Sequence, residues 1–316
     1  MAETAFFTRK KALFLMTCIL VFGLTGTSYP AAVTAVGKDA GLPPGEVRSL
    51  AVDGGKVYVA TGIRGVAVYD ASRGNVTDLT GGAPLAAREV SSLATFRGKL
   101  YVGTTDGLLA FDGRSWDRVE KAENVTLRNV MLAASPDGKE LWAAAMTLAG
   151  GTTKFDGSKW TFMGGAGRGL FNDISCFAFG KDGTWMGSVT GTVYLRKGED
   201  VQFFRDGLSG IVLALAATGD VLYAATNRGL FRLEGTVWKT VRFPEGWGGV
   251  QLLSMATDGI TLYLGTTAGL ARLAQGRFER LTRNDGLPAD QVGAVALGDG
   301  VVYAGTAAGL AVVRGW

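Results

Sequence analysis

The sequence predicts an all-β fold: a single seven-bladed β-propeller of four-stranded antiparallel blades, closed by an N-terminal outer strand. Three observations lead to it, namely a recurring phrase, a high glycine content and a match between segments near the two ends. The phrase is LYVGTTDGLLAF at 100–111, LYLGTTAGLARL at 262–273 and VVYAGTAAGLAVV at 301–313. The 316 residues include 48 glycines, about twice the average usage. Many short strands joined by tight turns need that much glycine.

The repeat is defined by an alanine followed by an aromatic residue. The spacing between the two is seven residues in six repeats and nine in the third, and the aromatics recur at 43, 41, 43, 38, 40 and 40 residues. A period of ~40–45 residues is typical of propeller blades. The alanines are Ala51, Ala94, Ala133, Ala178, Ala216, Ala256 and Ala296, and the aromatics are Tyr58, Tyr101, Trp142, Trp185, Tyr223, Tyr263 and Tyr303. We place the seven units at about 39–80, 81–121, 122–165, 166–205, 206–246, 247–283 and 284–316.

Each unit is predicted to contain four strands. A short apolar strand such as SLAVD leads through a tight turn to the aromatic strand, such as VYVAT. A second turn ending in glycine, such as Asp106-Gly107, leads to a third strand such as GLLAFD, and the fourth strand carries an aromatic such as Trp116. The second and third strands are apolar on both faces, as in sheets covered on both sides. Blades stacked in a ring supply that covering, and the alanines suit innermost strands that converge near the axis.

The two ends of the repeat array complement each other. The last unit stops after its third strand, at 311–316, whereas AVTAVGKDAGLP at 32–43 matches the fourth strand and following loop RFERLTRNDGLP at 277–288. Residues 32–37 are therefore predicted to form the outer strand of the blade at 285–313, which removes an open sheet edge. The alternative is an open solenoid of the same hairpins.

The first 28 residues have the layout of a secretory signal peptide. Arg9, Lys10 and Lys11 precede the apolar run Ala12–Leu24, and small residues follow near Ser28. The run is shorter than the ~20 residues that span a membrane. We expect a cleaved signal and a periplasmic or extracellular protein, with an uncleaved N-terminal anchor as the alternative and the only membrane contact.

The composition limits the chemistry. The chain has no histidine, so no imidazole can act as metal ligand, general base or proton shuttle. Its two cysteines, Cys18 and Cys176, lie in unrelated contexts and predict no disulfide framework. The net charge of +4 falls to about +2 without the first 28 residues, too little to indicate nucleic-acid binding.

The repeats resemble those of the bacterial two-component regulator propeller family, which are WD40-like in length. The resemblance lies in Gly286-Leu287-Pro288, Gly41-Leu42-Pro43 and the phrase at 262–270, and it is loosest at 142–151. It implies a propeller outside the membrane that senses ligands such as sugars. Members commonly pair two propellers with a histidine kinase, whereas we expect one propeller and no kinase in this chain.

Two segments that could suggest a phosphate-binding or a calcium-binding loop are explained more simply as turns. GGAGRG at 164–169 lacks the Gly-Lys-Ser/Thr of a phosphate loop, and PDGK at 136–139 lacks the alternating carboxylates of a calcium loop. Both are typical of turns. Asn75 and Asn124 fit a glycosylation pattern that a bacterial family leaves unused. We expect no catalytic residue, no metal and no cofactor.

The side chains expected on the face formed by the loops between blades are candidates for contact with a ligand or partner. An unusual aromatic, Trp247, replaces the Asp-Gly-Leu of other units, and MTLAGG at 146–151 adds length to the same face. The candidate contact residues are Arg64, Asp106, Arg168, Asn172, Asn227, Arg228, Trp247, Asp290 and Gln291. The alternative is that they are ordinary solvated loop residues.

The sequence favours a non-catalytic exported propeller that binds a protein or a small polar ligand such as a saccharide, as a sensory or accessory component. Two alternatives stay open: an assembly scaffold of the cell envelope that uses its blade edges, and a propeller enzyme of lyase or hydrolase type.

Overall fold

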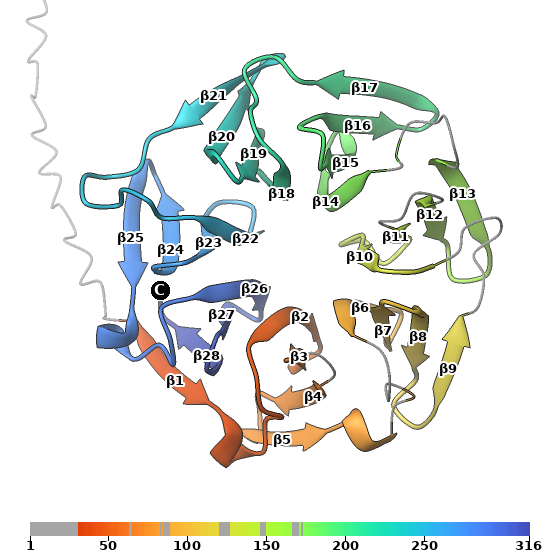
Figure 1. Ribbon diagram of the computed structural model, residues 1–316, viewed down its shortest axis with the longest axis vertical. Coiled ribbons are helices and arrows are strands. Elements are labelled where there is room, and N and C mark those ends of the chain that lie inside the picture. Colours follow the sequence, from red (N-terminus) through yellow and green to blue (C-terminus); the bar gives the residue numbers. More distant parts are fainter. Residues whose placement is uncertain are drawn as a thin grey trace, which may run out of the picture.

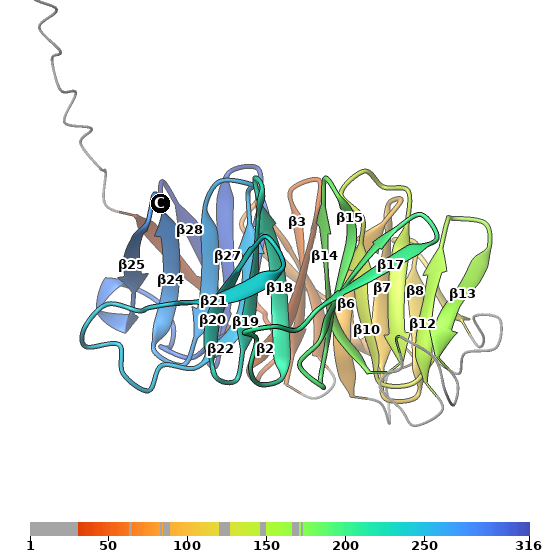
Figure 2. The same cartoon turned by 90° about the horizontal axis from the view of Figure 1, so that it is seen from above.

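Seven four-stranded antiparallel sheets stand around a central axis in the computed structural model and form a closed propeller (Figure 1). The structure describes residues 31–62, 65–82, 84, 89–119, 127–145, 150–165, 171 and 173–316. The predicted signal segment lies outside these residues, as do the candidates Arg64, Arg168 and Asn172. Seen from the side, the strands run between the two faces of a disc (Figure 2).

The first three blades follow one another along the chain, each built from inside to outside. The first contains β2 (Val47–Asp53), β3 (Lys56–Thr61), β4 (Gly65–Asp70) and β5 (Asn75–Asp78). The second contains β6 (Val90–Phe96), β7 (Lys99–Thr104), β8 (Gly107–Phe111) and β9 (Trp116–Val119). The third contains β10 (Val130–Ala134), β11 (Leu141–Ala145), β12 (Gly151–Phe155) and β13 (Trp160–Gly165).

The fourth to sixth blades repeat the order. The fourth contains β14 (Ile174–Gly180), β15 (Gly183–Ser188), β16 (Val193–Lys197) and β17 (Asp200–Phe204). The fifth contains β18 (Val212–Thr218), β19 (Val221–Thr226), β20 (Gly229–Glu234) and β21 (Val237–Val241). The sixth contains β22 (Leu252–Thr257), β23 (Leu262–Thr266), β24 (Gly269–Ala274) and β25 (Arg277–Leu281).

The seventh blade joins the two ends of the described chain. Its strands are β26 (Val292–Gly298), β27 (Val301–Thr306), β28 (Gly309–Arg314) and, on the outside, β1 (Ala32–Val36). β1 pairs with β28 from Ala32 opposite Arg314 to Val36 opposite Leu310. The described loops between blades include three short 3-10 helices: η1 (Lys38–Ala40), η2 (Thr80–Gly82) and η3 (Arg283–Asp285). The predicted closing strand is confirmed, and the open solenoid is wrong.

The strand register explains the repeat. In all seven blades the alanine of the innermost strand is the cross-strand partner of the aromatic in the next strand, as with Ala51 opposite Tyr58 and Ala296 opposite Tyr303. The third blade keeps this pairing, Ala133 opposite Trp142, because its extra two residues lie in the turn. A small residue opposite a large ring leaves room for that ring. The alanine therefore has a second, local cause besides the crowding of innermost strands at the axis.

The innermost strands form a ring of their own. Each contacts the innermost strand of the next blade, from β2 through β6, β10, β14, β18, β22 and β26 back to β2. Six of them carry a β-bulge near their start, such as that between Val212 and Ala214, whereas β10 pairs regularly with β11. A bulge bends a strand and raises its twist. Hydrogen bonds also cross between blades: the Ser175 hydroxyl donates to the Val212 carbonyl oxygen at 2.5 Å.

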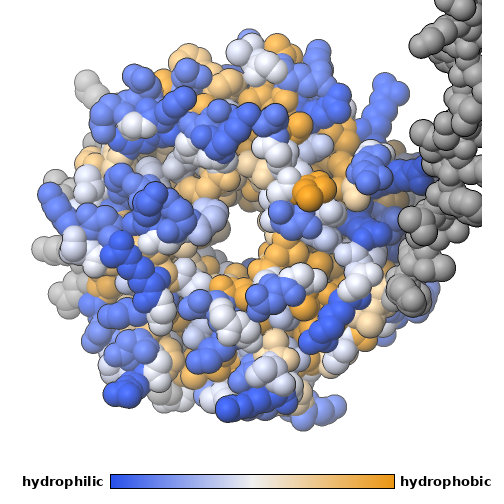
Figure 3. All heavy atoms as spheres, turned by 180° about the vertical axis from the view of Figure 1, so that it is seen from behind, coloured by the Kyte–Doolittle hydropathy of each residue, from blue (hydrophilic) through white to orange (hydrophobic). Residues whose placement is uncertain are grey.

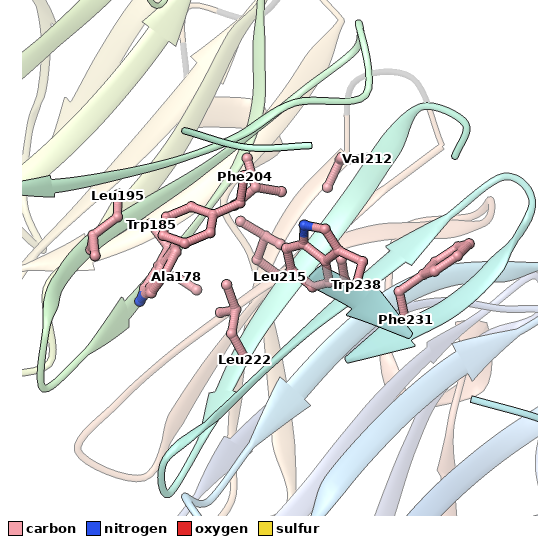
Figure 4. Close-up of a cluster of buried hydrophobic side chains, with 11 residues drawn as sticks. Ala178, Trp185, Leu195, Phe204, Val212, Leu215, Leu222, Phe231 and Trp238 are labelled. Atoms are coloured by element: carbon pink, nitrogen blue, oxygen red, sulfur yellow. The ribbon is translucent and has the colours of Figure 1, made fainter. Parts of the chain in front are cut away.

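The core lies between neighbouring blades. Figure 4 shows one such cluster, in which Trp185 and Phe204 of the fourth blade face Leu215 and Leu222 of the fifth. The rings of Trp185 and Phe204 are 5.2 Å apart between centroids. Since each apolar side chain buried in this way contributes about 1.5–3 kcal/mol, stacking of blades supplies much of the stability of the ring. Among the described residues, no helix has the length and apolar character needed to cross a membrane.

Candidate ligand-binding site

The ring has two faces with different connections. On the loop face, loops between blades meet the turns between the second and third strands of each blade. On the turn face lie the remaining turns within blades. Backbone bonds fix the loops to the turns: the Asn227 N–H donates to the Ile211 carbonyl at 3.2 Å, and that of Ala307 to Gln291 at 3.0 Å. Residues from different strands therefore share one rigid surface.

Two adjoining hollows open on the loop face over the fourth to sixth blades. The larger, of 670 Å³, lies between the turn 226–229 and the loop 243–252. The smaller, of 380 Å³, lies between the turn 189–191 and the loop 205–211. Asn227 and Arg228 line both hollows, so the two adjoin at these residues, and we call them together the groove.

The turn that carries Arg228 is held by side-chain hydrogen bonds. The Thr226 hydroxyl accepts from the Arg228 N–H at 3.0 Å and donates to the Gly229 carbonyl at 3.3 Å. The same pair of bonds closes the turn at Thr266 and at Thr306, which explains the threonine in the repeated phrase. Asn227 Oδ1 accepts from the Ile211 N–H at 2.8 Å and ties the turn to the preceding loop.

Trp247 lies at the other end of the groove, in an aromatic cluster. Its ring stacks on Phe243 at 5.7 Å and meets Phe278 at 5.5 Å between centroids. The Arg280 guanidinium lies over it at 4.7 Å. Trp247 is half-buried and packs against the core between the fifth and sixth blades. Much of its ring is thus occupied by protein, and it fixes the loop 243–252 as well as lining the larger hollow.

The other candidates within the described residues do not converge on the groove. Asp106 forms ion pairs with Arg118 at 3.5 Å and Arg128 at 4.0 Å in the second and third blades. Asp290 Oδ1 accepts from the Arg283 N–H at 2.8 Å, within the loop that contains η3. The Gln291 amide donates to Glu46 at 2.8 Å, across the junction of the seventh and first blades. These three side chains hold loops in place.

Sequence reasoning missed most of the lining of the smaller hollow, including an exposed arginine and an exposed isoleucine. Arg205 follows β17 directly, and Ile211, 40% exposed, precedes β18. In the repeat both positions are ordinary loop positions, and only the approach of the turn at 189–191 brings them into a hollow with Asn227 and Arg228. An arginine directly after an outer strand was the signal that the sequence offered.

Other hollows differ from the groove because their described lysines are paired with carboxylates or because they lie away from the loop face. One of 660 Å³ on the turn face includes Lys139, bound to Asp137 at 2.9 Å, and Lys181, bound to Asp220 at 2.5 Å. The Lys139 ammonium and the Ser135 hydroxyl lower the pKa of Asp137 to about 2. The central channel is open in the space-filling view (Figure 3). Two hollows of 590 and 570 Å³ lie between outer parts of neighbouring blades.

The described residues offer binding groups more than reactive ones. They contain no group of three or more carboxylates and cysteines placed to hold a metal ion. Burial raises the pKa of the Cys176 thiol to about 12, so it stays protonated, although the residue keeps some exposed surface. The groove presents guanidinium, amide and apolar groups and, in the larger hollow, the carboxylate of Glu245, and these groups can recognise a ligand by hydrogen bonds and contact.

No protein-family model matches the chain, and no curated protein matches it. Solved structures do. Two are extracellular domains of hybrid two-component systems from B. thetaiotaomicron, with TM-scores of 0.69 and 0.70 and identities of 16% and 18%. They cover 91% and 89% of this chain, and the chain covers 42% and 39% of them, about two fifths of their length.

A third similar structure is virginiamycin B lyase from Staphylococcus aureus, with a TM-score of 0.68, 11% identity and coverage of 90% of this chain and 99% of that one. The similar structures thus include extracellular domains of two-component systems and an enzyme. At these identities the similarity shows the fold alone, and function has to be argued from the site.

Proposed function

We propose that this chain is an exported, non-catalytic propeller that binds a protein or a polar ligand through its loop face. The observation that carries the proposal is the convergence of Asn227, Arg228 and Trp247, chosen from the sequence as contact candidates, on one groove. The extracellular origin of two similar domains supports export and a sensory or accessory role.

The alternatives have less support on the molecule. A scaffold that uses its outer strands needs a contiguous apolar surface. Among the residues that the structure describes, the two most exposed large apolar side chains, Phe203 at 73% and Ile260 at 81%, lie on different blades. The lyase shows that a similar ring can hold an enzyme, but this chain offers no histidine to serve as a base.

The test is a binding screen with variants of the two faces. Purified protein is exposed to arrayed glycans and peptides, and each bound compound is recovered and weighed by mass spectrometry. We expect at least one compound whose affinity falls about tenfold or more in Arg228→Ala/Trp247→Ala, because a charge-assisted contact and the loop that frames it are lost. Trp247→Phe, which preserves ring packing, should lose less.

The matched control is Lys139→Ala/Lys181→Ala on the turn face, which should bind like the wild type. Binding that depends on the turn-face lysines, or that ignores both pairs, would place the site elsewhere. A recovered compound of altered mass would show catalysis and contradict the proposal.

A further inference from the structure

Among its described lining residues, the smaller hollow of the groove has two guanidinium groups and no carboxylate. Arg205 follows β17, and Arg228 lies in the turn after β19; both are exposed. Within the described ranges neither side chain has an ion pair, whereas elsewhere in the ring Arg196 binds Glu199 at 3.0 Å and Arg272 binds Glu279 at 2.7 Å. The two groove arginines therefore keep their donors for a ligand.

The third polar side chain shared by the two hollows also offers donors. Because Asn227 Oδ1 already accepts from the Ile211 N–H at 2.8 Å, the free hydrogen-bonding group of this amide is its NH₂. Thr190, at the border of the smaller hollow, donates to Asp173 Oδ2 at 2.6 Å. A ligand that fits must supply acceptors, and a carboxylate matches the planar guanidinium fork with two parallel bonds.

Apolar groups lie directly beside these cations. Ile211, 40% exposed, and Leu208 line the same hollow as the two arginines. Among its described lining residues there is no aromatic ring on which a sugar could stack, and the Trp247 ring of the larger hollow already contacts Phe243, Phe278 and Arg280. Aliphatic contact next to a carboxylate suits a peptide better than a saccharide.

We infer that the groove binds an acidic peptide segment of a partner protein, with carboxylates on Arg205 and Arg228 and an aliphatic side chain on Ile211. The segment continues past Asn227 into the larger hollow, toward the loop 243–252, with its uncharged residues there because Glu245 lines that hollow. This inference rests on the proposed function, since it specifies the ligand of the same face.

The test begins with selection of a random phage-displayed peptide library on the full-length protein. We expect the enriched sequences to be rich in Asp and Glu next to aliphatic residues. The leading sequence is then synthesised with a fluorescent label, together with a twin in which Gln and Asn replace Glu and Asp. Fluorescence anisotropy should show at least about tenfold weaker binding of the twin, and affinity should fall as salt rises from about 0.05 to about 0.5 M.

The decisive variant is Arg205→Ala/Arg228→Ala, for which we expect a loss of about tenfold or more. The matched control is Lys239→Ala/Arg242→Ala, which removes two exposed positive charges from the hollow of 590 Å³ at the rim and should change affinity less than about twofold. Arg205→Lys/Arg228→Lys keeps the charge without the fork and should restore part of the affinity.

Three results would overturn the inference: no enrichment of acidic residues, equal binding by wild type and Arg205→Ala/Arg228→Ala, or an equal loss in the rim control. An oligogalacturonate that binds the groove while the library yields no peptide would overturn it and leave the proposed function standing. Failure of both the peptide library and the glycan array would reject the proposed function itself.

Discussion

Two hollows of nearly equal volume lie on opposite faces of the ring, 670 Å³ on the loop face and 660 Å³ on the turn face. They differ in the state of their cations. On the turn face Lys139 and Lys181 are each bound to an aspartate, whereas Arg228 on the loop face has no ion pair within the described part of the chain. Volume alone does not mark a candidate site in this propeller; free hydrogen-bonding capacity does.

The largest expected effect comes from a glycine beneath the groove. Gly210 has a φ of +88°, and an added Cβ would collide with Asn227 Oδ1 and come within 3.0 Å of Arg228 Cγ. Gly210→Ala combines left-handed strain with a steric clash, so we expect a loss of about 3 kcal/mol in the free energy of unfolding. Urea denaturation measures it, and loss of peptide binding should accompany it.

The control is Gly219→Ala on the turn face. Its φ of +57° imposes similar strain, but the nearest atom to an added Cβ is the Gly259 carbonyl oxygen at 3.9 Å. For Gly219→Ala we expect a loss of about 1–2 kcal/mol in the free energy of unfolding and unchanged peptide binding. Equal losses in the two variants would show that the loop face is no more tightly fitted than the turn face.

A smaller effect is expected from the threonines that close turns on the two faces. Thr226→Val removes the hydrogen bonds to the Arg228 N–H and the Gly229 carbonyl. It should lower the free energy of unfolding by about 1–2 kcal/mol. Thr257 makes equivalent bonds on the turn face, to the Gly259 N–H at 2.9 Å and the Thr261 carbonyl at 2.8 Å. Thr257→Val should cost about 1 kcal/mol, because this residue is less buried.

Affinity for the acidic peptide should distinguish the two threonine variants. Only Thr226→Val should weaken the acidic peptide, since only that turn orients Arg228. Thermal unfolding and anisotropy on the same samples give both readouts. A Thr257→Val variant that loses peptide affinity would mean that the faces are coupled through the blade.

The smallest effect is a dependence on pH that belongs to the turn face. The Lys139 side chain lowers the pKa of Asp137 to about 2, and backbone and hydroxyl donors of Lys159 and Ser158 lower that of Asp156 to about 2. Their ordinary pKa is 3.8, so their contribution to stability is present above about pH 4 and lost as the pH falls toward 2.

Melting temperatures measured across that range should fall less steeply in Asp137→Asn/Asp156→Asn than in the wild type. Asp182→Asn is the control, because Asp182 accepts no hydrogen bond from the described residues. An unchanged slope in the double variant would show that other carboxylates carry the acid sensitivity.

Much of the fold was accessible from the sequence because each blade repeats the same cross-strand pair. Ala216 opposite Tyr223 is one of seven such pairs, and their spacing survives even the longer turn of the third blade. The closing strand was predictable because the last unit stops after its third strand, while residues 32–43 match the fourth strand and following loop at 277–288. The bulges were not, because an extra residue near Val212 leaves the distance from alanine to aromatic unchanged.

The site was only partly accessible. The repeat gives the face on which a loop residue lies, so Asn227 and Arg228 could be chosen, but it does not give the contacts between neighbouring loops. Arg205 joins them because its loop meets the turn of its own blade, and Trp247 is half-buried because Phe243 and Phe278 approach it. Such contacts depend on side-chain packing between blades, which a single sequence does not encode as a pattern.

The pairing of β1 with β28 also has a mechanical meaning. Ala32 and Arg314 are partners at one end of the ladder, and Val36 and Leu310 at the other. Tension applied through both ends of the described chain would load one pair of β1 and β28 residues at a time and unzip these two strands at low force. A pull on β1 at Val36, against Arg314, would load all pairs of the two strands together in shear. The ring therefore resists force applied in this geometry far better than force applied at Ala32 and Arg314.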